Sequence, residues 1–119
     1  MKVGTLLGLA ALLGGAAAVS ACGGEDGEAT GSTCPSDSTL SYDNFGEQFF
    51  QSNCLVCHGA NGPESPKFDT VEQIRANSGE IDKQAAAGPN AVNTSMPEDG
   101  SVSEADRRKL GEWLACGAP

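Results

Sequence analysis

The residues best suited to chemistry form one short motif, Cys54-Leu-Val-Cys57-His58. Two cysteines three residues apart lie on one turn of a helix, so both thiols reach the two vinyl groups of a single porphyrin and can form thioethers. A histidine directly after the second cysteine is then placed beneath the iron as its proximal ligand. The motif therefore predicts one covalently bound haem c, with Cys54, Cys57 and His58 as its binding residues.

Two other kinds of site also use paired cysteines. A thioredoxin-like redox pair belongs to a βαβ context, and residues 40–119 show no alternating strand pattern. A zinc site needs two more ligands, and the chain offers only His58, its single histidine, and the scattered Cys34 and Cys116. Haem attachment is therefore the stronger prediction.

The N-terminal part of the chain has the pattern of an export signal. Lys2 is followed by an uncharged run, residues 3–21, rich in Leu, Ala and Gly. The run ends in Val19-Ser20-Ala21-Cys22, which resembles the lipobox of bacterial lipoproteins. This resemblance implies a signal peptide over residues 1–21, lipidation of Cys22, and export to the periplasm or cell envelope with a lipid anchor in a membrane. An uncleaved transmembrane anchor is the alternative, although its many Gly and Ala residues make it a weak span.

Charge and apolar content limit what the chain can be. Its 119 residues carry 16 acidic and 7 basic side chains, a net charge of −9, which disfavours nucleic acid as a partner. Only 14 of the 98 residues from Cys22 onward are Leu, Ile, Val or Phe. A chain this short and polar needs disulfides, a metal or a large apolar cofactor in order to fold. We therefore expect one domain that is largely unfolded without its haem.

Two cysteines remain, Cys34 and Cys116, one near each end of the mature chain. An exported protein resides in an oxidising compartment, where two leftover thiols are usually joined. A disulfide that closes so long a loop contributes around 4 kcal/mol. Two free thiols are the alternative, since a bridge also requires the two Cα atoms to lie close together.

The mature chain divides into a tether and a helical domain. Residues 22–39 are small, polar and acidic, without apolar periodicity, and they predict a flexible acidic tether ahead of a domain over residues 40–119. A first helix is expected after Ser41, its N-cap. Aromatic residues at three- and four-residue steps give this helix one apolar stripe, formed by Tyr42, Phe45, Phe49 and Phe50.

Short helices and loops are expected in the middle of the domain. Asp69 and Glu72 resemble a capping pair that opens one short helix, and a second runs over residues 78–87. Residues 90–100 have the composition of a loop. The last helix begins at Ser101 or Ser103. Its apolar side is formed by Leu110, Trp113 and Leu114. A basic run towards its C-terminal half is formed by Arg107, Arg108 and Lys109.

Met96 is the candidate for the second axial ligand of the iron. It is the only methionine left once the signal peptide is removed, and it lies in a Pro- and Gly-containing loop rather than on an apolar face. Its soft thioether favours ferrous iron and raises the reduction potential. We therefore expect His58 and Met96 as the two metal ligands.

These features together resemble the small bacterial class I cytochromes c, over about residues 40–118. The resemblance rests on motifs in a fixed order. They are Gly46 with Phe50, the segment from Cys54 to Gly59, Ser95-Met96-Pro97 with Gly100, Leu110 with Trp113, and Gly117-Ala118. In that family the glycine of the first helix permits close approach of the last helix.

The resemblance implies an all-α cytochrome c-like fold, with the N- and C-terminal helices packed around one covalent haem and short helices and loops between them. It also implies a one-electron carrier rather than an enzyme, with a redox donor and acceptor as partners. The carbonyl that orients His58 would come from Pro63 or Pro66. The acidic charge suggests a basic docking face on the partner, or serves only solubility.

Two other functions remain open at this point. The chain could be a haem subunit permanently docked on a periplasmic oxidoreductase. It could also be a haem gas sensor or a peroxidase-like protein, which needs an open sixth coordination position and is therefore disfavoured by Met96.

Overall fold

The computed structural model describes residues 27–119, and the predicted signal peptide and Cys22 lie outside this part of the chain. The described chain is helical, and its one extended pairing is an isolated antiparallel bridge between Ala87 and Val92. The all-α prediction is therefore confirmed. The elements are a π-helical turn Tyr42–Gly46 (η1) and the helices Glu47–Asn53 (α1), Leu55–His58 (α2), Val71–Ala76 (α3), Ser78–Ala85 (α4) and Glu104–Ala115 (α5).

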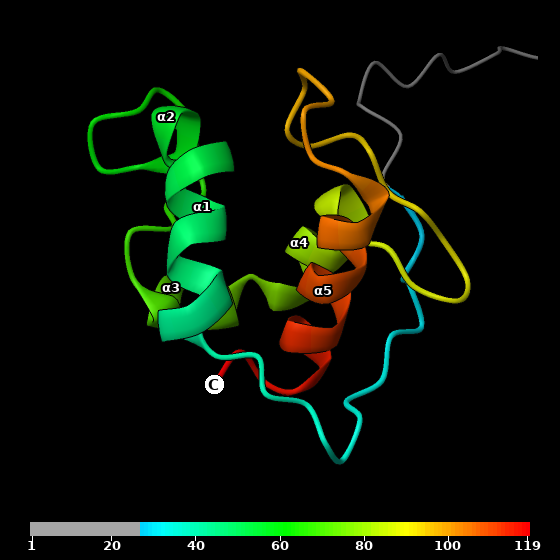
Figure 1. The fold of residues 1–119 in the computed structure, drawn as a ribbon. Helices are drawn as coiled ribbons and strands as arrows, with labels where there is room; N and C mark the ends of the chain where they lie inside the picture. The colour runs from blue at the N-terminus through cyan, green and yellow to red at the C-terminus, as the bar shows by residue number, and fades with distance from the viewer. Residues whose placement is uncertain (1–26) are drawn as a thin grey trace, which may run out of the picture.

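The first helical segment begins where the sequence predicts. Ser41 has an extended backbone and its hydroxyl accepts from the backbone N–H of Asn44, while the Asn44 side chain accepts from the N–H of Ser41. The segment opens as a π-turn and continues as α1, so the two together carry the aromatic stripe towards Cys54. Figure 1 shows α1 and α2 on one side of the molecule and α4 and α5 on the other.

Gly46 is where the first and last helices meet. A Cβ added at this glycine would lie 2.5 Å from Cζ2 of Trp113, closer than two carbon atoms can approach. Trp113 is fully buried, and its ring lies 6.2 Å from that of Phe50, centroid to centroid. The close approach that the resemblance implied is thus present, and the missing side chain is its physical cause.

The core is small and lies between the two helical sides. It combines the aromatic stripe of η1 and α1 with apolar residues of the other helices and of the segment before α3. Its buried members are Phe49, Phe50, Phe68, Ile74, Ile81, Ala85, Ala86, Leu110, Trp113, Leu114 and Ala118.

Of two expected helix starts, that of α3 differs in detail and that of α5 agrees. At α3 the capping pair is Thr70 with Gln73, and the carboxylate of Asp69 instead accepts from the backbone N–H of Ala60 (2.9 Å). At α5 the N-cap is Ser103, whose hydroxyl accepts from the N–H of Asp106. Since α5 begins at Glu104, the basic run starting at Arg107 lies in its N-terminal and middle turns, and the expectation of a C-terminal position was wrong.

The expectation of a flexible tether is wrong for residues 27–39. These residues, called the strap from here on, run beside α4 and α5. Thr30 of the strap is fully buried. The hydroxyl and the backbone N–H of Thr30 both donate to the carboxylate of Asp82, at 2.6 and 2.8 Å. Ser32 donates to the carbonyl of Ala87, at a point where Gly111 of α5 leaves room for it. Small polar residues of the strap therefore attach it to the helical domain through hydrogen bonds. A search for apolar periodicity in the sequence does not detect such contacts.

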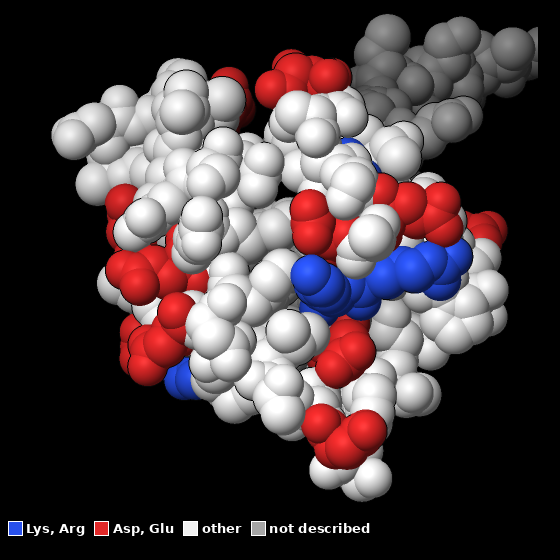
Figure 2. Space-filling model, viewed as in Figure 1, with Lys and Arg blue, Asp and Glu red and all other residues white. Residues whose placement is uncertain are grey.

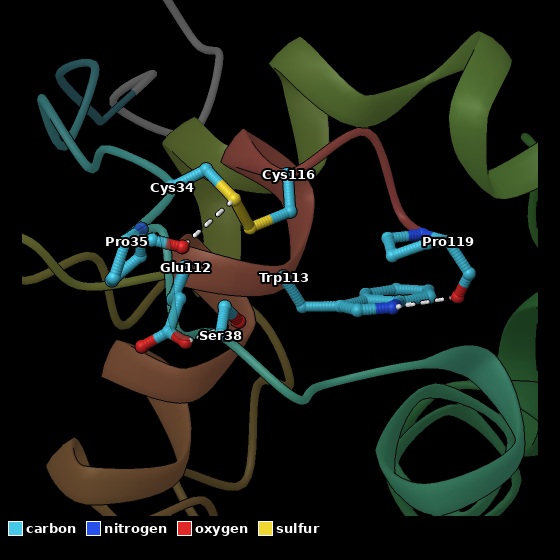
Figure 3. Close-up of a disulfide and its surroundings, with 7 residues drawn as sticks. All are labelled: Cys34, Pro35, Ser38, Glu112, Trp113, Cys116 and Pro119. Carbon is cyan, nitrogen blue, oxygen red and sulfur yellow. Dashed lines mark hydrogen bonds between the residues drawn. A yellow bond between two sulfur atoms is a disulfide. The ribbon is translucent and has the colours of Figure 1, made fainter.

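A disulfide joins the strap to the end of α5 (Figure 3). Cys34 and Cys116 are bridged with their Cα atoms 4.7 Å apart and 82 positions apart in the sequence, the pairing that the cysteine count favoured. In the chain-entropy description, closing so long a loop stabilises the folded state by about 4 to 5 kcal/mol. Ser38 adds a hydrogen bond of 2.6 Å to the carboxylate of Glu112.

The C-terminal residues tie the helical sides together. The carbonyl of Pro119 accepts from the backbone N–H of Tyr42 (2.6 Å) and from the indole Nε1 of Trp113 (3.3 Å). The carbonyl of Ala118 accepts from Nε of Arg75 in α3 (3.0 Å). The tail therefore closes the end of the domain opposite α2.

The contact at Gly46 gives a test of the packing. Gly46→Ala should lower the free energy of unfolding by about 1 to 3 kcal/mol, because the new methyl group overlaps the Trp113 ring and the two helices must move apart. Denaturant unfolding of the holoprotein measures this change. The matched control is Gly79→Ala in α4, where an added Cβ meets nothing within 4 Å, and this change should be neutral or stabilising by up to about 1 kcal/mol. Equal effects of the two substitutions would contradict the close contact.

Candidate functional site

The C-x-x-C-H motif forms a helical turn directly after α1. Cys54 ends α1 and precedes α2, and its carbonyl accepts from the backbone N–H groups of Cys57 (3.2 Å) and His58 (2.8 Å). The two cysteines therefore lie on one turn, as their spacing predicts. The break in the helix at Cys54, with φ −123° and ψ −38°, separates the core-facing α1 from the exposed α2.

The two thiols have different surroundings. Cys54 is half-buried and packs against the core, whereas Cys57 is exposed. Burial raises the pKa of the Cys54 thiol to about 12, so this thiol is protonated at neutral pH. Between them Val56 is 83% exposed, which leaves one side of the turn open to solvent.

His58 has one ring nitrogen held and the other free for a ligand. Its Nδ1 lies 2.8 Å from the carbonyl oxygen of Pro66, and because a carbonyl only accepts, Nδ1 carries the proton and donates. Nε2 then has the lone pair that a metal requires. Of the two prolines considered, Pro66 is therefore the partner. Phe68, which sequence reasoning did not single out, packs its ring 5.0 Å from the imidazole.

The turn after His58 is held by its own polar contacts. The backbone N–H groups of Glu64 and Phe68 donate to the carbonyls of Cys57 and His58, each at 2.9 Å. Gly62 lies so close to the carbonyl of Cys57 that any side chain there would overlap it. This packing brings the Pro66 carbonyl back onto the imidazole.

Met96 lies in a different segment, between α4 and α5. Its backbone N–H donates to the carbonyl of Gln84 in α4 (2.8 Å), and its side chain is 36% exposed. In Figure 1 the loop that carries it and the α2 turn lie at the same end of the molecule, on opposite sides. The structure thus brings Cys54, Cys57 and His58 together on one turn and places Met96 on the facing half of the domain.

Arg107, which the sequence analysis did not single out, contacts the candidate ligand Met96. Its side chain is 1% exposed, and its Nη1 donates to the carbonyl of Met96 at 2.6 Å. A signal was present, because Arg107 precedes Leu110 by three residues and Leu114 by seven, which places it on the apolar face of α5.

Acidic side chains outnumber basic ones, 16 to 7. On the face drawn in Figure 2, acidic side chains are scattered over the surface and most of the visible basic side chains form one band. Two basic residues of α5 are already paired with acidic neighbours, Arg108 with Glu104 at 2.7 Å and Lys109 with Asp106 at 3.9 Å. In the Met96 loop, hydrogen bonds from Ser101 lower the pKa of the Asp99 carboxyl, and Arg107 adds to the effect.

The donor set has the chemistry of a haem c site. Two thiols on one turn supply the thioethers, and an imidazole whose Nδ1 is already engaged supplies a nitrogen ligand. Two of the candidate ligands of the zinc alternative, Cys34 and Cys116, are joined to each other in the disulfide. The helical fold also lacks the βαβ context of a thioredoxin-like pair throughout residues 27–119.

Comparison with known proteins identifies the domain. No curated protein and no solved structure matches the chain. A family model described as cytochrome c oxidase, cbb3-type, subunit III matches residues 44–114, which include the C-x-x-C-H turn, Met96 and most of α5. Cytochrome c domains of this type bind haem c covalently and transfer electrons. The chain therefore belongs to the family of cytochrome c oxidase, cbb3-type, subunit III, and is a small c-type cytochrome.

Proposed function

We propose that this protein is a one-electron carrier whose haem c is bound through thioethers to Cys54 and Cys57, with His58 as the proximal ligand and Met96 as the distal ligand. The observation that carries the proposal is the hydrogen bond from Nδ1 of His58 to the carbonyl of Pro66, on the turn that holds both cysteines. This bond fixes the tautomer and the orientation that metal ligation by Nε2 requires.

The protein's own residues set the conditions for electron transfer. The haem, when bound, supplies an iron that alternates between the ferric and ferrous states. His58, oriented by Pro66, is a stronger donor because its Nδ1–H is polarised by a carbonyl. Phe68 and Phe50, whose rings lie 5.5 Å apart, provide an apolar environment next to the imidazole. A low local dielectric of this kind favours the less charged ferrous state.

Met96 fits the distal position for two reasons. Its loop lies at the same end of the domain as the C-x-x-C-H turn, on the opposite side. Met96 is also a partly exposed residue that does not belong to the hydrophobic core. Ligation by this sulfur fills the sixth position, which argues for electron transfer and against a gas sensor or a peroxidase-like protein.

Membrane attachment through Cys22 remains part of the proposal. The predicted lipidation site is five positions before Gly27, where the described strap begins. An extended chain of that length spans at most about 18 Å. With residues 27–39 docked on α4 and α5, a lipid on Cys22 would hold the domain closer to the membrane surface than a free tether over residues 22–39 would.

The family description favours a second possibility for the biological context. Its name refers to a subunit of an oxidase, so this cytochrome could be permanently docked on an oxidoreductase and relay electrons within it. Co-purification with a partner in a fixed stoichiometry would support this role, and isolation as a monomeric haem protein would support the free carrier.

The first prediction from this proposal concerns the role of the haem in folding. Cys54→Ala combined with Cys57→Ala should give colourless protein with greatly reduced helicity, because the small core lacks the apolar area that the haem supplies. Absorption spectra and circular dichroism measure the two effects. The control is Cys34→Ser combined with Cys116→Ser, which should retain the haem and its colour. A colourless double alanine variant with full helicity would contradict this prediction.

The second prediction concerns the distal ligand. Met96→Ala should keep the covalent haem, lose the weak long-wavelength band of ferric iron bound by methionine sulfur, and bind carbon monoxide readily when reduced, because its sixth position is open. The unchanged protein should bind carbon monoxide slowly at neutral pH. Rapid binding by the unchanged protein would instead revive the sensor or peroxidase-like alternative.

The third prediction concerns docking. We propose that the excess of acidic side chains binds a partner with a basic docking face (Figure 2). The rate of electron exchange with a small basic redox protein should then fall as ionic strength rises, because salt screens the attraction. Exchange with an acidic redox protein is the control and should accelerate with salt. Rates that do not depend on salt for either protein would show that the acidity serves only solubility.

A further inference from the structure

A buried guanidinium connects the Met96 loop to the rest of the domain. Nη1 of Arg107 donates to the carbonyl oxygens of Ala85 (2.8 Å), Asn93 (2.9 Å) and Met96 (2.6 Å). Nε of the same side chain lies 3.3 Å from the carbonyl of Val102. One cation therefore binds the end of α4 and three places along the loop, including the peptide of Met96 itself.

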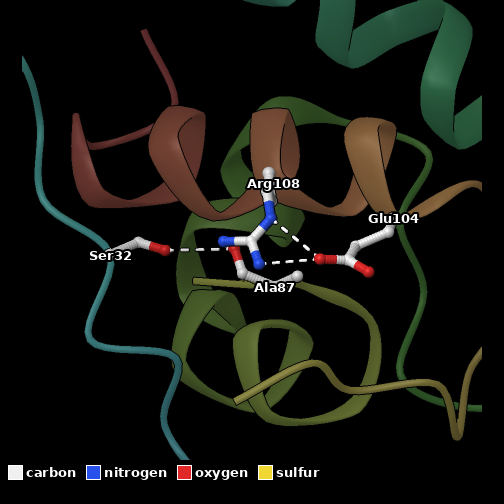
Figure 4. Close-up of polar contacts among 4 residues, drawn as sticks. All are labelled: Ser32, Ala87, Glu104 and Arg108. Atoms are coloured by element: carbon white, nitrogen blue, oxygen red, sulfur yellow. Dashed lines mark hydrogen bonds and ion pairs between the residues drawn. The ribbon is translucent and has the colours of Figure 1, made fainter. Parts of the chain in front are cut away.

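The contacts of Arg107 differ from those of its basic neighbours. Arg108 is exposed and pairs with the carboxylate of Glu104 (Figure 4), and Lys109 is exposed and pairs with that of Asp106. Arg107 is 1% exposed and its hydrogen bonds go to backbone carbonyls. A guanidinium suits this position, because its five donors have fixed directions and its charge strengthens each bond to a carbonyl. Burial lowers the pKa of Arg107 and the carboxylate of Asp99 raises it, and the group stays charged at neutral pH.

Other hydrogen bonds also hold this loop. The described contacts of its backbone include the bond from Met96 N–H to Gln84 and a turn in which Gly100 N–H donates to Pro97 (3.0 Å). A thioether is a neutral and weak ligand, so its binding depends on how firmly the protein holds it in place. Asn93 in the same loop adds two bonds, because its side-chain amide donates to the carbonyls of Glu28 in the strap (2.7 Å) and Asp82 in α4 (2.9 Å).

We propose that Arg107 is a positioning residue for the distal ligand. Its hydrogen bonds fix the loop so that the Met96 sulfur stays in the sixth position, and its buried positive charge favours the ferrous state over the more positive ferric state. This inference rests on the proposed ligation by Met96. It goes beyond that proposal because it assigns the stability of the ligation to a residue that is not itself a ligand.

The test compares Arg107 variants with matched variants of Arg108 in the holoprotein. Arg107→Met removes the charge and the donors, and Arg107→Lys keeps the charge but not the planar arrangement of donors. Arg108→Met and Arg108→Lys make the same changes one residue along the helix, at an exposed site paired with Glu104. Four properties are measured: the long-wavelength band of methionine-ligated ferric iron, the rate of carbon monoxide binding to reduced protein, the midpoint potential, and the helicity.

We expect Arg107→Met to weaken Met96 ligation about tenfold or more, as loss of charge-assisted hydrogen bonds to the loop implies. The band should weaken, carbon monoxide binding should accelerate by a similar factor, and the midpoint potential should fall. Arg107→Lys should show an intermediate loss, and both Arg108 variants should match the unchanged protein. If Arg107→Met does not fold, Arg107→Lys decides, provided that its helicity is native.

Two outcomes would overturn separate claims. If the unchanged protein shows the methionine band and the folded Arg107 variants keep both the band and slow carbon monoxide binding, Arg107 is only a structural cation and the inference is wrong. If the unchanged protein itself lacks the band and binds carbon monoxide rapidly, the ligation by Met96 is wrong and the proposed positioning role falls with it.

Discussion

The contact between Gly46 and Trp113 is the constraint on which the rest of the domain depends. The missing side chain of Gly46 lets the indole ring lie against the backbone of the first helical segment, so η1 and α1 are fixed against α5. The C-x-x-C-H turn follows α1 directly, and Arg107 with the Met96 loop lies at the start of α5. One crossing of two helices therefore determines how the two halves of the candidate haem site face each other.

A hydrogen bond to a backbone carbonyl holds each of the two proposed axial ligands. For His58 the carbonyl belongs to another residue, and for Met96 it is the ligand's own. His58 donates from its ring to the carbonyl of Pro66, so its orientation depends on the turn that follows the motif. Met96 is held through its own carbonyl, which accepts from Arg107. With so few large apolar side chains, the domain cannot position these residues by packing alone. Directional, partly buried hydrogen bonds therefore contribute to positioning them.

The strap illustrates the same principle outside the site. Residues 27–39 contain no apolar stripe, yet Thr30 is fully buried because Asp82 satisfies both its hydroxyl and its backbone N–H. The disulfide between Cys34 and Cys116 then secures the strap to the end of α5. The helical domain of this cytochrome therefore includes a segment with the composition of a linker. That segment also contacts the Met96 loop through Asn93.

The sequence by itself determined the features that depend on local spacing. The C-x-x-C-H turn, the Ser41 cap, the aromatic stripe of the first helix and the helical class all follow from patterns within a few residues. Only the tertiary structure decided which carbonyl orients His58, which carbonyls Arg107 binds, and that residues 27–39 are docked. The physical reason is that each of these depends on which hydrogen-bond partners the fold brings together. For His58 and Arg107 the acceptors are backbone carbonyls, which every residue type offers. For residues 27–39 they include the carboxylates of Asp82 and Glu112 in distant helices. The residue type therefore shows which side chain can donate a hydrogen bond, and only the fold shows which acceptor that side chain meets.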